Sequence, residues 1–376
     1  MQMTGIADIE ALRAVDKGTD LALVISTTSV WLFLACRIIL ATGESGNFPA
    51  AIKVTAEYFP KKDRAYATSI FNAGASVGAL AAPLTIPILA EHMGWEWAFI
   101  IIGAIGFVWA GAWLFMYSAP ADSKFVNQAE LAYIESDKGE VVEETSTDEN
   151  EVKLSFLDCF KYRQTWAFIV GKLMTDGVWW FFLFWAPAYF SELGYPSSSG
   201  MGQALIFVLY LIVTLLSIYG GYLPKLFVEK MGMNPYAGRM RAMLIFAFLP
   251  IFAMFAQPLA HISPWWPCVI IGLAGAGHQA WSANLYSTIG DMFPKSAIAT
   301  ITGIGTMFGG LCSFAINKGS GMLFTYADEL GDAFQFFGAT GKPAGYMIVF
   351  CYCAVAYLIG WLIMKTLVPK YKPITK

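Results

Sequence analysis

Long runs of apolar residues dominate the chain and alternate with short polar or charged connections. Runs long enough to cross a bilayer lie at roughly 21–48, 66–90, 97–117, 165–190, 202–224, 241–258, 265–290, 298–325 and 344–367. None of them shows the alternating pattern of a membrane β-strand, and a helix satisfies its own backbone hydrogen bonds in lipid. The pattern therefore predicts an all-α membrane protein with about nine transmembrane helices.

The amino-acid composition also indicates a membrane protein, and it excludes several classes of function. Hydrophobic residues make up 57% of the chain and charged residues 14%, with a mean hydropathy of +0.56. A water-soluble globule carries about a quarter of charged residues, so that class is excluded. The six cysteines are scattered without zinc spacing, and neither an HExxH nor a GxSxG motif occurs. We therefore expect no enzyme, no metal, no cofactor and no nucleic-acid partner.

Lysine and arginine in the connections predict the orientation. They follow the first predicted span (Lys61, Lys62, Arg64), follow the fifth, and recur in the tail, whereas the alternate connections 91–96, 191–201 and 258–264 have none. The positive-inside rule makes the basic connections cytoplasmic, with the N-terminus outside and the C-terminus inside. The expected organisation is an extracytoplasmic polar segment (1–20), three spans of an N-terminal half (21–117), a cytoplasmic linker (118–163) and a six-helix bundle (164–376).

An internal repeat with an offset of 234 residues indicates that the two halves have the same orientation. GESGNFPAAIKVTAEYFPKKDR aligns without gaps to GHQAWSANLYSTIGDMFPKSAI, so that Phe59-Pro60-Lys61 meets Phe293-Pro294-Lys295. Like-oriented halves with a substrate site near the midplane are the plan of the major facilitator fold. Since six spans follow the linker and only three precede it, we expect this chain to lack the first three spans of that fold.

Arg37 and Glu44 are the leading candidate site residues. Both lie within the first apolar run, where an ionisable side chain is expensive and usually marks a substrate or proton path. They are seven residues apart, so on a helix they share one face at about 10 Å along the axis. That distance prevents direct neutralisation, so each needs another partner; a purely structural role in helix packing is the alternative.

Two later spans contribute further candidates. Lys172 and Asp176 are adjacent on one helical face, and they either pair with each other or contact substrate. His278 occupies the repeat position of Glu44 and is a candidate for substrate or proton contact. For the side-chain amides of Gln279 and Asn284, two interpretations stay open: recognition of substrate hydroxyls and hydrogen bonds that bridge helices. The remaining candidates are Trp180, Gln279 and Asn284 in these two spans and Asn47 in the first apolar run.

Three segments resemble a known family: RIILATGESGNFPAAIKVTAEYFPKKDRAYATSIFNAGASVGA, TDGVWWFFLFWAPAYF and GHQAWSANLYSTIGDMFPK are similar to hexuronate permeases of the anion:cation symporter family, within the major facilitator superfamily. The likeness extends over nearly the whole chain after residue 20. It implies proton-coupled uptake of glucuronate or galacturonate across a bacterial inner membrane. By the same resemblance, Glu44 is the proton carrier and Arg37 belongs to the charge network around the anion.

Three alternatives stay open at this point. The carried anion could be another organic acid, such as an aldonate or an aromatic acid, the coupling ion could be sodium, or the chain could be a remnant that does not transport. The expected partners are a small anionic sugar acid, a proton and the lipid bilayer, and the expected state is a monomer.

Overall fold

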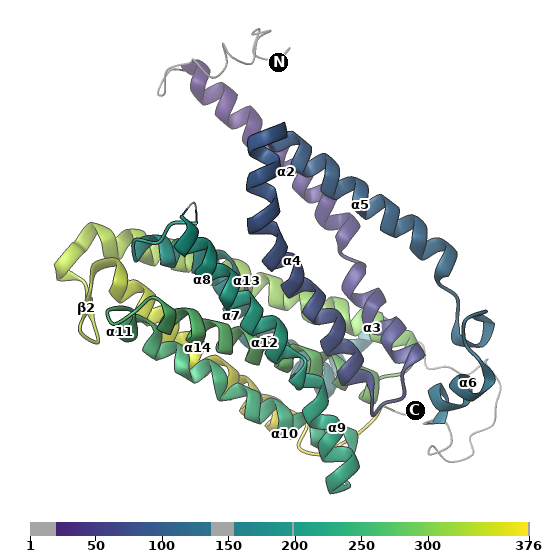
Figure 1. The fold of residues 1–376 in the computed structure, drawn as a ribbon. Coiled ribbons are helices and arrows are strands. Elements are labelled where there is room, and N and C mark those ends of the chain that lie inside the picture. The colour runs from purple at the N-terminus through teal and green to yellow at the C-terminus, as the bar shows by residue number, and fades with distance from the viewer. Residues whose placement is uncertain (1–19, 137–153, 198, 375–376) are drawn as a thin grey trace. The chain divides into compact units, whose positions relative to one another are not determined.

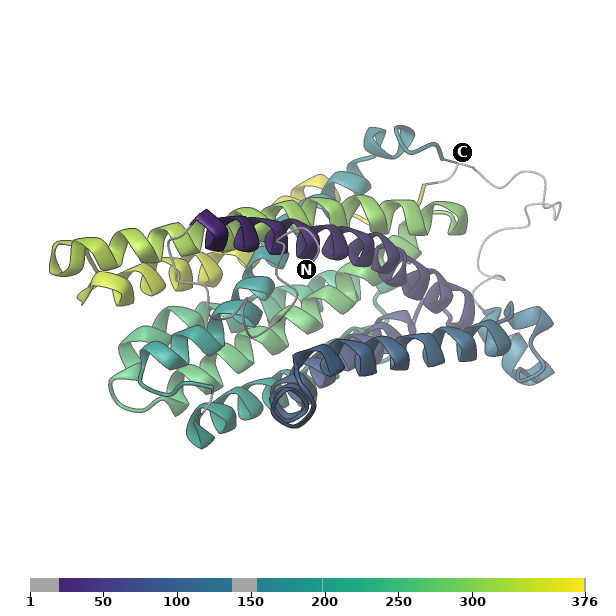
Figure 2. The same ribbon diagram turned by 90° about the horizontal axis from the view of Figure 1, so that it is seen from above.

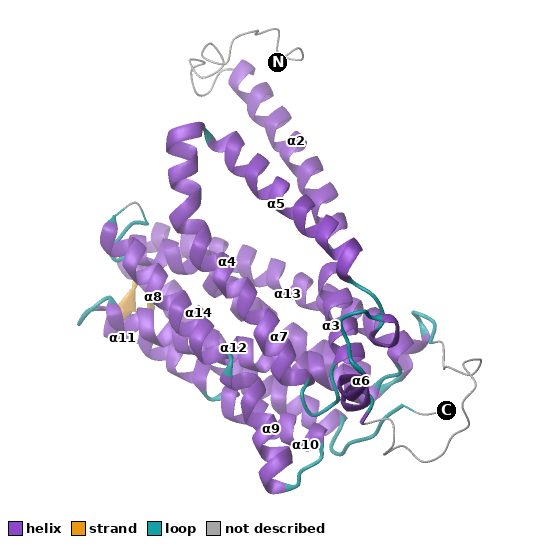
Figure 3. Ribbon diagram, turned by 45° about the vertical axis from the view of Figure 1, so that its right-hand side comes forward, coloured by secondary structure: helices purple, strands orange, loops and turns teal. Residues whose placement is uncertain are grey.

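The computed structural model describes residues 20–136, 154–197 and 199–374, and this part of the chain is almost wholly helical (Figures 1 and 3). The α-helices are α2 (Asp20–Glu44), α3 (Asn47–Tyr58), α4 (Arg64–Met93), α5 (Trp95–Met116), α6 (Gln128–Ile134), α7 (Arg163–Glu192), α8 (Gly200–Ser217), α9 (Tyr219–Met231), α10 (Pro235–Ala247), α11 (Ala256–Ala260), α12 (Trp265–Met292), α13 (Lys295–Leu330) and α14 (Gly341–Leu367). Short 3₁₀ turns are η1 (Pro120–Asp122), η4 (Asp158–Lys161), η5 (Leu249–Phe255) and η6 (Gly331–Ala333), and strands β1 (Gln335–Phe336) and β2 (Ala339–Thr340) pair antiparallel.

The all-helical membrane architecture is confirmed. Within the described ranges, seven helical segments are long and apolar enough to cross a membrane: 22–58, 95–116, 163–192, 200–231, 235–260, 296–333 and 341–367. The two other predicted spans, 66–90 and 265–290, lie within the long helices α4 and α12, and α12 is less apolar than the seven segments. The count of about nine spans therefore stays a prediction.

The chain divides into two compact units, residues 1–50 and 51–376. In the first, α2 ends at Glu44 and α3 begins at Asn47, so the helix is interrupted at Ser45 and Gly46 near the end of the predicted span 21–48. The Ser45 hydroxyl donates to the carbonyl of Thr42, and Gly46 follows it. A hydroxyl that competes for backbone groups and a residue without a Cβ both weaken a helix at this point.

Residues 118–136 belong to the predicted linker and include the short helix α6. The Asn127 side chain accepts a hydrogen bond from the backbone N–H of Glu130 at 2.8 Å, which caps the helix. Most of the acidic run that follows, residues 137–153, lies outside the described residues. The polar segment 1–19 also lies outside them.

Within the unit 51–376, α12 lies at the centre. It packs against α8, α10 and α4, while α7 packs against α13 and α14 (Figures 1 and 2). Nearly every residue of α12 is buried, although the helix contains His278, Asn284 and Asp291. Because its surface meets protein on most sides, it does not need the apolar exterior of a lipid-facing helix. That burial accounts for its lower hydropathy.

Two adjacent glycines bring α4 and α12 against α9. A Cβ added at Gly220 would lie 2.4 Å from Cα of Ala280, and one at Gly221 would lie 2.4 Å from Cα of Tyr66. Both clashes involve backbone atoms, which cannot rotate away. The glycine pair therefore sets how closely these three helices approach.

We expect Gly221→Ala to lower the free energy of unfolding by about 1–3 kcal/mol, because the new methyl group forces α4 away from α9. Gly310→Ala is the matched control, since Gly310 also lies within a helix but has nothing within 4 Å of its Cβ position. Thermal unfolding of both variants in detergent checks this. Equal stability of the two variants would contradict the close approach.

Candidate functional site

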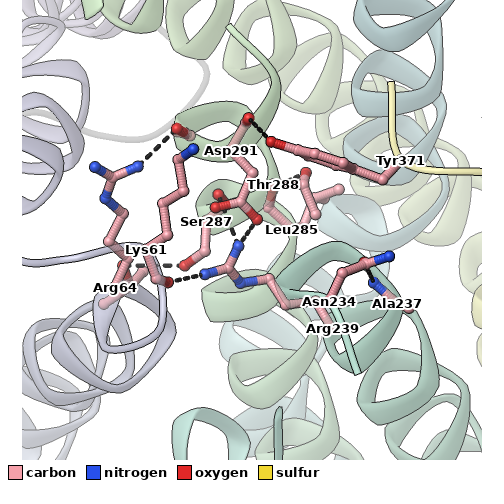
Figure 4. Close-up of polar contacts among 12 residues, drawn as sticks. Lys61, Arg64, Asn234, Ala237, Arg239, Leu285, Ser287, Thr288, Asp291 and Tyr371 are labelled. Carbon is pink, nitrogen blue, oxygen red and sulfur yellow. Dashed lines mark hydrogen bonds and ion pairs between the residues drawn. The ribbon is translucent and has the colours of Figure 1, made fainter. Parts of the chain in front are cut away.

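The basic connections of the unit 51–376 meet at one end, which we call the basic end (Figure 4). It comprises the turn 59–64, the first turns of α10, the last turns of α12 and the tail 368–374. Tail and helix are joined by hydrogen bonds from Tyr371 Oη to the Asp291 carbonyl at 3.2 Å and from the Ile374 N–H to the Met292 carbonyl at 2.8 Å. The side of the membrane on which these connections lie stays a prediction.

Arg239 contacts several segments of the basic end. Its guanidinium forms an ion pair with the Asp291 carboxylate and donates to the Lys61 carbonyl and, at 3.4 Å, to the Ser287 carbonyl. Only 1% of the residue is exposed. A guanidinium this deeply buried is tolerated because a carboxylate neutralises it and several acceptors surround it. Arg239 thereby connects α10 to both α12 and the turn before α4.

Arg64 fastens the same turn to α12. Its guanidinium donates to the carbonyls of Gly290 at 2.6 Å, Phe59 at 3.0 Å and Ala56 at 3.0 Å. Two of these acceptors belong to the segment around Arg64 itself, and the third is on α12, 226 residues further along the chain. The two arginines thus hold α3, α4, α10 and α12 together at this end.

Removing one partner of the Arg239–Asp291 pair leaves the other charge buried, so Arg239→Met and Asp291→Leu should each destabilise the protein by about 3–5 kcal/mol. The double variant should lose much less stability than the sum of the losses in the two single variants, because neither buried charge remains in it. Thermal unfolding of the four proteins of this double-mutant cycle measures the difference. Additive losses would show that the pair does not act as a unit.

Asp63 forms a second, more exposed link at the basic end. Its carboxylate accepts from Lys225 Nζ at 2.7 Å and from Tyr133 Oη at 2.5 Å, which joins the turn before α4 to α9 and to α6. Burial by itself would raise the pKa of Asp63, but the hydrogen bonds from Lys225 and Tyr133 and the charges of Lys225 and Lys62 outweigh it and lower the pKa. The hydrogen bond from Tyr133 to the Asp63 carboxylate correspondingly raises the pKa of Tyr133.

A carboxylate whose pKa is lowered by folding stabilises the protein above its unfolded pKa and loses that contribution as the pH falls through the native pKa. Asp63→Asn should therefore cost about 1 kcal/mol at pH 7, with the deficit shrinking below about pH 4. Tyr133→Phe, which leaves Lys225 in place, should cost less. Thermal unfolding at several pH values tests this, and a deficit of constant size would contradict it.

Inside the bundle, Lys172 and Asp176 pair with each other. Lys172 Nζ lies 2.8 Å from the Asp176 carboxylate and 2.9 Å from Tyr286 Oη on α12, and both charged residues are buried. On α13, a Cβ added at Gly309 would lie 2.2 Å from the Asp176 carboxylate, so this glycine makes the room for it. The neutral, enclosed pair matches the first of the two interpretations that the sequence allowed.

His278 is held by residues of two other helices. Its Nδ1 lies 2.7 Å from Tyr357 Oη on α14, and its ring stacks on Trp179 of α7 at 5.2 Å between centroids. Tyr357 Oη also donates to the Thr175 carbonyl at 3.4 Å. The imidazole is therefore fixed in orientation, and Nε2 is the nitrogen that Tyr357 does not contact.

The other candidates of the C-terminal half differ in their surroundings. Asn284 Nδ2 donates at 2.8 Å to the carbonyls of Gly220 and Ala280, which is the helix-bridging arrangement, and its buried Oδ1 has no hydrogen-bond partner among the described residues. Gln279 is buried. Trp180 is 37% exposed and stacks on Phe184, so the structure does not bring it to His278.

Arg37 and Glu44 both lie on α2, and Asn47 is the first residue of α3. The two charged residues belong to one continuous helix, so the argument that they share a face about 10 Å apart applies to them. They are part of the unit 1–50.

Several residues of these clusters were not among the sequence candidates: Trp179, Arg239, Tyr286, Asp291 and Tyr357. A usable signal existed for Asp291, because it is an acid directly after the predicted span 265–290, next to the basic turn. The buried tyrosines carry a weaker signal, since a phenol in a membrane needs a hydrogen-bond partner that sequence does not identify. Across the described ranges, no group of three or more His, Cys, Asp or Glu is placed to hold a metal ion.

Comparison with known proteins adds a family match. The profile of the Major Facilitator Superfamily matches residues 20–316. A hexuronate transporter of Escherichia coli is 30% identical over 332 residues, covering 87% of this chain and 70% of that protein. A galacturonate transporter of Dickeya chrysanthemi is 30% identical over 58% of this chain and 64% of its own length. A D-galactonate transporter of Escherichia coli is 30% identical over 54% of this chain and 48% of its own length.

Proposed function

Because the chain belongs to the major facilitator superfamily, we propose that it carries a sugar acid, of the hexuronate class, across the bacterial inner membrane by proton-coupled symport. The observation that carries this proposal is the 30% identity to a hexuronate transporter over 87% of the chain. A family of transporters and relatives named as transporters point away from an enzyme. The described helices that are long and apolar enough to span a bilayer fit a multi-pass protein.

Glu44 is the proposed proton carrier and Arg37 the proposed anchor of the charge network around the carboxylate. Protonation of Glu44 removes a negative charge that would repel an anionic sugar, so the proton and the substrate favour each other's binding. A guanidinium matches the two oxygens of a carboxylate with two parallel hydrogen bonds. The 10 Å or so between them on α2 leaves room for a sugar ring between the two groups.

The C-terminal half would supply neutral groups for the hydroxyls. His278, Gln279 and Asn284 are the proposed contacts, and Asn47 on α3 is a further one. His278 offers Nε2, and Asn284 offers its buried Oδ1, because the other polar atoms of these two side chains are already engaged. Lys172 and Asp176 neutralise each other, so we assign them a role in positioning α7 and α12.

The basic end is the proposed inner gate. Alternating access requires the two sides of the membrane to open in turn, by rocking of one half against the other. Opening towards the basic end would have to break the hydrogen bonds of Arg64 to Gly290 and of Arg239 to Lys61, because these bonds join segments that come before and after the linker. Alternating access thus predicts that these contacts are transient during transport.

Uptake into proteoliposomes with labelled glucuronate, galacturonate, galactonate and benzoate tests the substrate class. We expect accumulation of a hexuronate under an inward proton gradient and no accumulation when an inward sodium gradient replaces the proton gradient. Preference for galactonate would favour the aldonate alternative, which the galactonate transporter among the relatives supports. Failure of all four acids to enter would overturn the proposal that this chain transports.

Glu44→Gln tests the proton carrier in the same vesicles. The amide cannot release a proton, so gradient-driven accumulation should fall to the background while exchange of internal for external substrate persists. Glu96→Gln, which removes an acid at the first turn of α5, is the matched control and should keep both activities. Equal loss of accumulation and exchange in Glu44→Gln would contradict the carrier role.

A further inference from the structure

A cavity of about 630 Å³ opens where the start of α7 meets the tail after α14. Its lining includes Lys161, Tyr162, Arg163, Lys370, Tyr371 and Lys372. No carboxylate is part of the lining over the described residues. The nearby Asp158 pairs with Lys161 at 2.6 Å, which still leaves an excess of positive charge around the cavity. The proposed transport path does not use this cavity.

The walls of the cavity are held in place by hydrogen bonds. Gln164 Nε2 donates to the Lys372 carbonyl at 2.9 Å, and Tyr371 and Ile374 bond to the end of α12. Tyr236 Oη donates to the Val368 carbonyl at 2.6 Å, which fixes the start of the tail to α10. The lysines of the tail therefore belong to a hydrogen-bonded segment and line the same cavity as Arg163.

The surroundings are those of a membrane–water interface. Phe156 and Leu157, just before η4, are 52% and 73% exposed, and Trp166 on the first turn of α7 is 43% exposed. The Trp166 indole donates its N–H to the Phe160 carbonyl at 2.8 Å. Exposed apolar side chains next to an aromatic ring with a bonded polar tip are typical of the headgroup level of a bilayer.

We propose that this cavity binds the phosphate-bearing headgroup of an anionic phospholipid. The lysines and Arg163 would donate to the phosphate oxygens, and the acyl chains would lie along the exposed apolar sides of α7 and α14. A free phosphate would use the same cations but would gain nothing from the apolar residues beside them. The inference rests on the proposed membrane embedding and not on the identity of the carried substrate.

The test counts lipids that remain on the purified full-length chain. Phosphatidylglycerol and phosphatidylcholine are added in equal amounts in detergent, and retained molecules are counted by native mass spectrometry. We expect a clear preference for phosphatidylglycerol that weakens at high salt. Lys370→Gln/Lys372→Gln should reduce that retention by roughly tenfold or more, since each basic residue near an anionic surface contributes to its attraction.

The matched control is Lys124→Gln/Lys230→Gln, which removes two exposed lysines outside the cavity lining and should keep the preference. Thermal unfolding confirms that each variant is folded. Equal retention of the two lipids by the unaltered chain would overturn the proposal, as would equal loss in the two double variants. A rise in unfolding temperature with inorganic phosphate, without selective lipid retention, would assign the cavity to a free phosphate instead.

Discussion

An ionised side chain inside an apolar helical bundle has to be neutralised by another group of the protein, because lipid offers it neither water nor a counterion. Two ion pairs meet this requirement in the unit 51–376. Lys172 and Asp176 are adjacent on α7 and are covered by Tyr286 and Gly309 from neighbouring helices. Arg239 and Asp291 join α10 to α12. The positions of these helices relative to α12 depend on satisfying those charges.

This requirement separates two kinds of intramembrane charge in the chain. The Lys172–Asp176 pair is closed on itself, and a neutral pair has little left to offer a substrate. Arg37 and Glu44 cannot neutralise each other across about 10 Å on one helix. In the proposed mechanism, an anion and a proton are the partners of these two charges. For that reason the proposed coupling rests on α2 and not on α7.

The basic end joins helices to one another, and it also borders the proposed lipid cavity. Arg64, Arg239 and Asp63 connect the segment before the linker to helices after it, and each uses a different acceptor or donor. The tail that borders the proposed lipid cavity is bonded to the same end of α12 through Tyr371. A headgroup bound there would act on the tail next to the contacts that the proposed gate has to break. Lipid composition and gate opening would then be linked through α12.

The sequence by itself determined the membrane class, the helical architecture and the family resemblance, because hydropathy, charge placement and motif spacing are properties of the chain read locally. It also predicted the adjacency of Lys172 to Asp176, which follows from helical spacing. It missed the break at Ser45 and Gly46, where weak helix formers sit in an apolar run. Only the tertiary structure decided that Tyr357 orients His278, that Asn284 binds the backbone of α9, and that Arg239 meets Asp291. Each of these contacts joins helices that are distant along the chain, and a single sequence contains no measure of which helix faces meet.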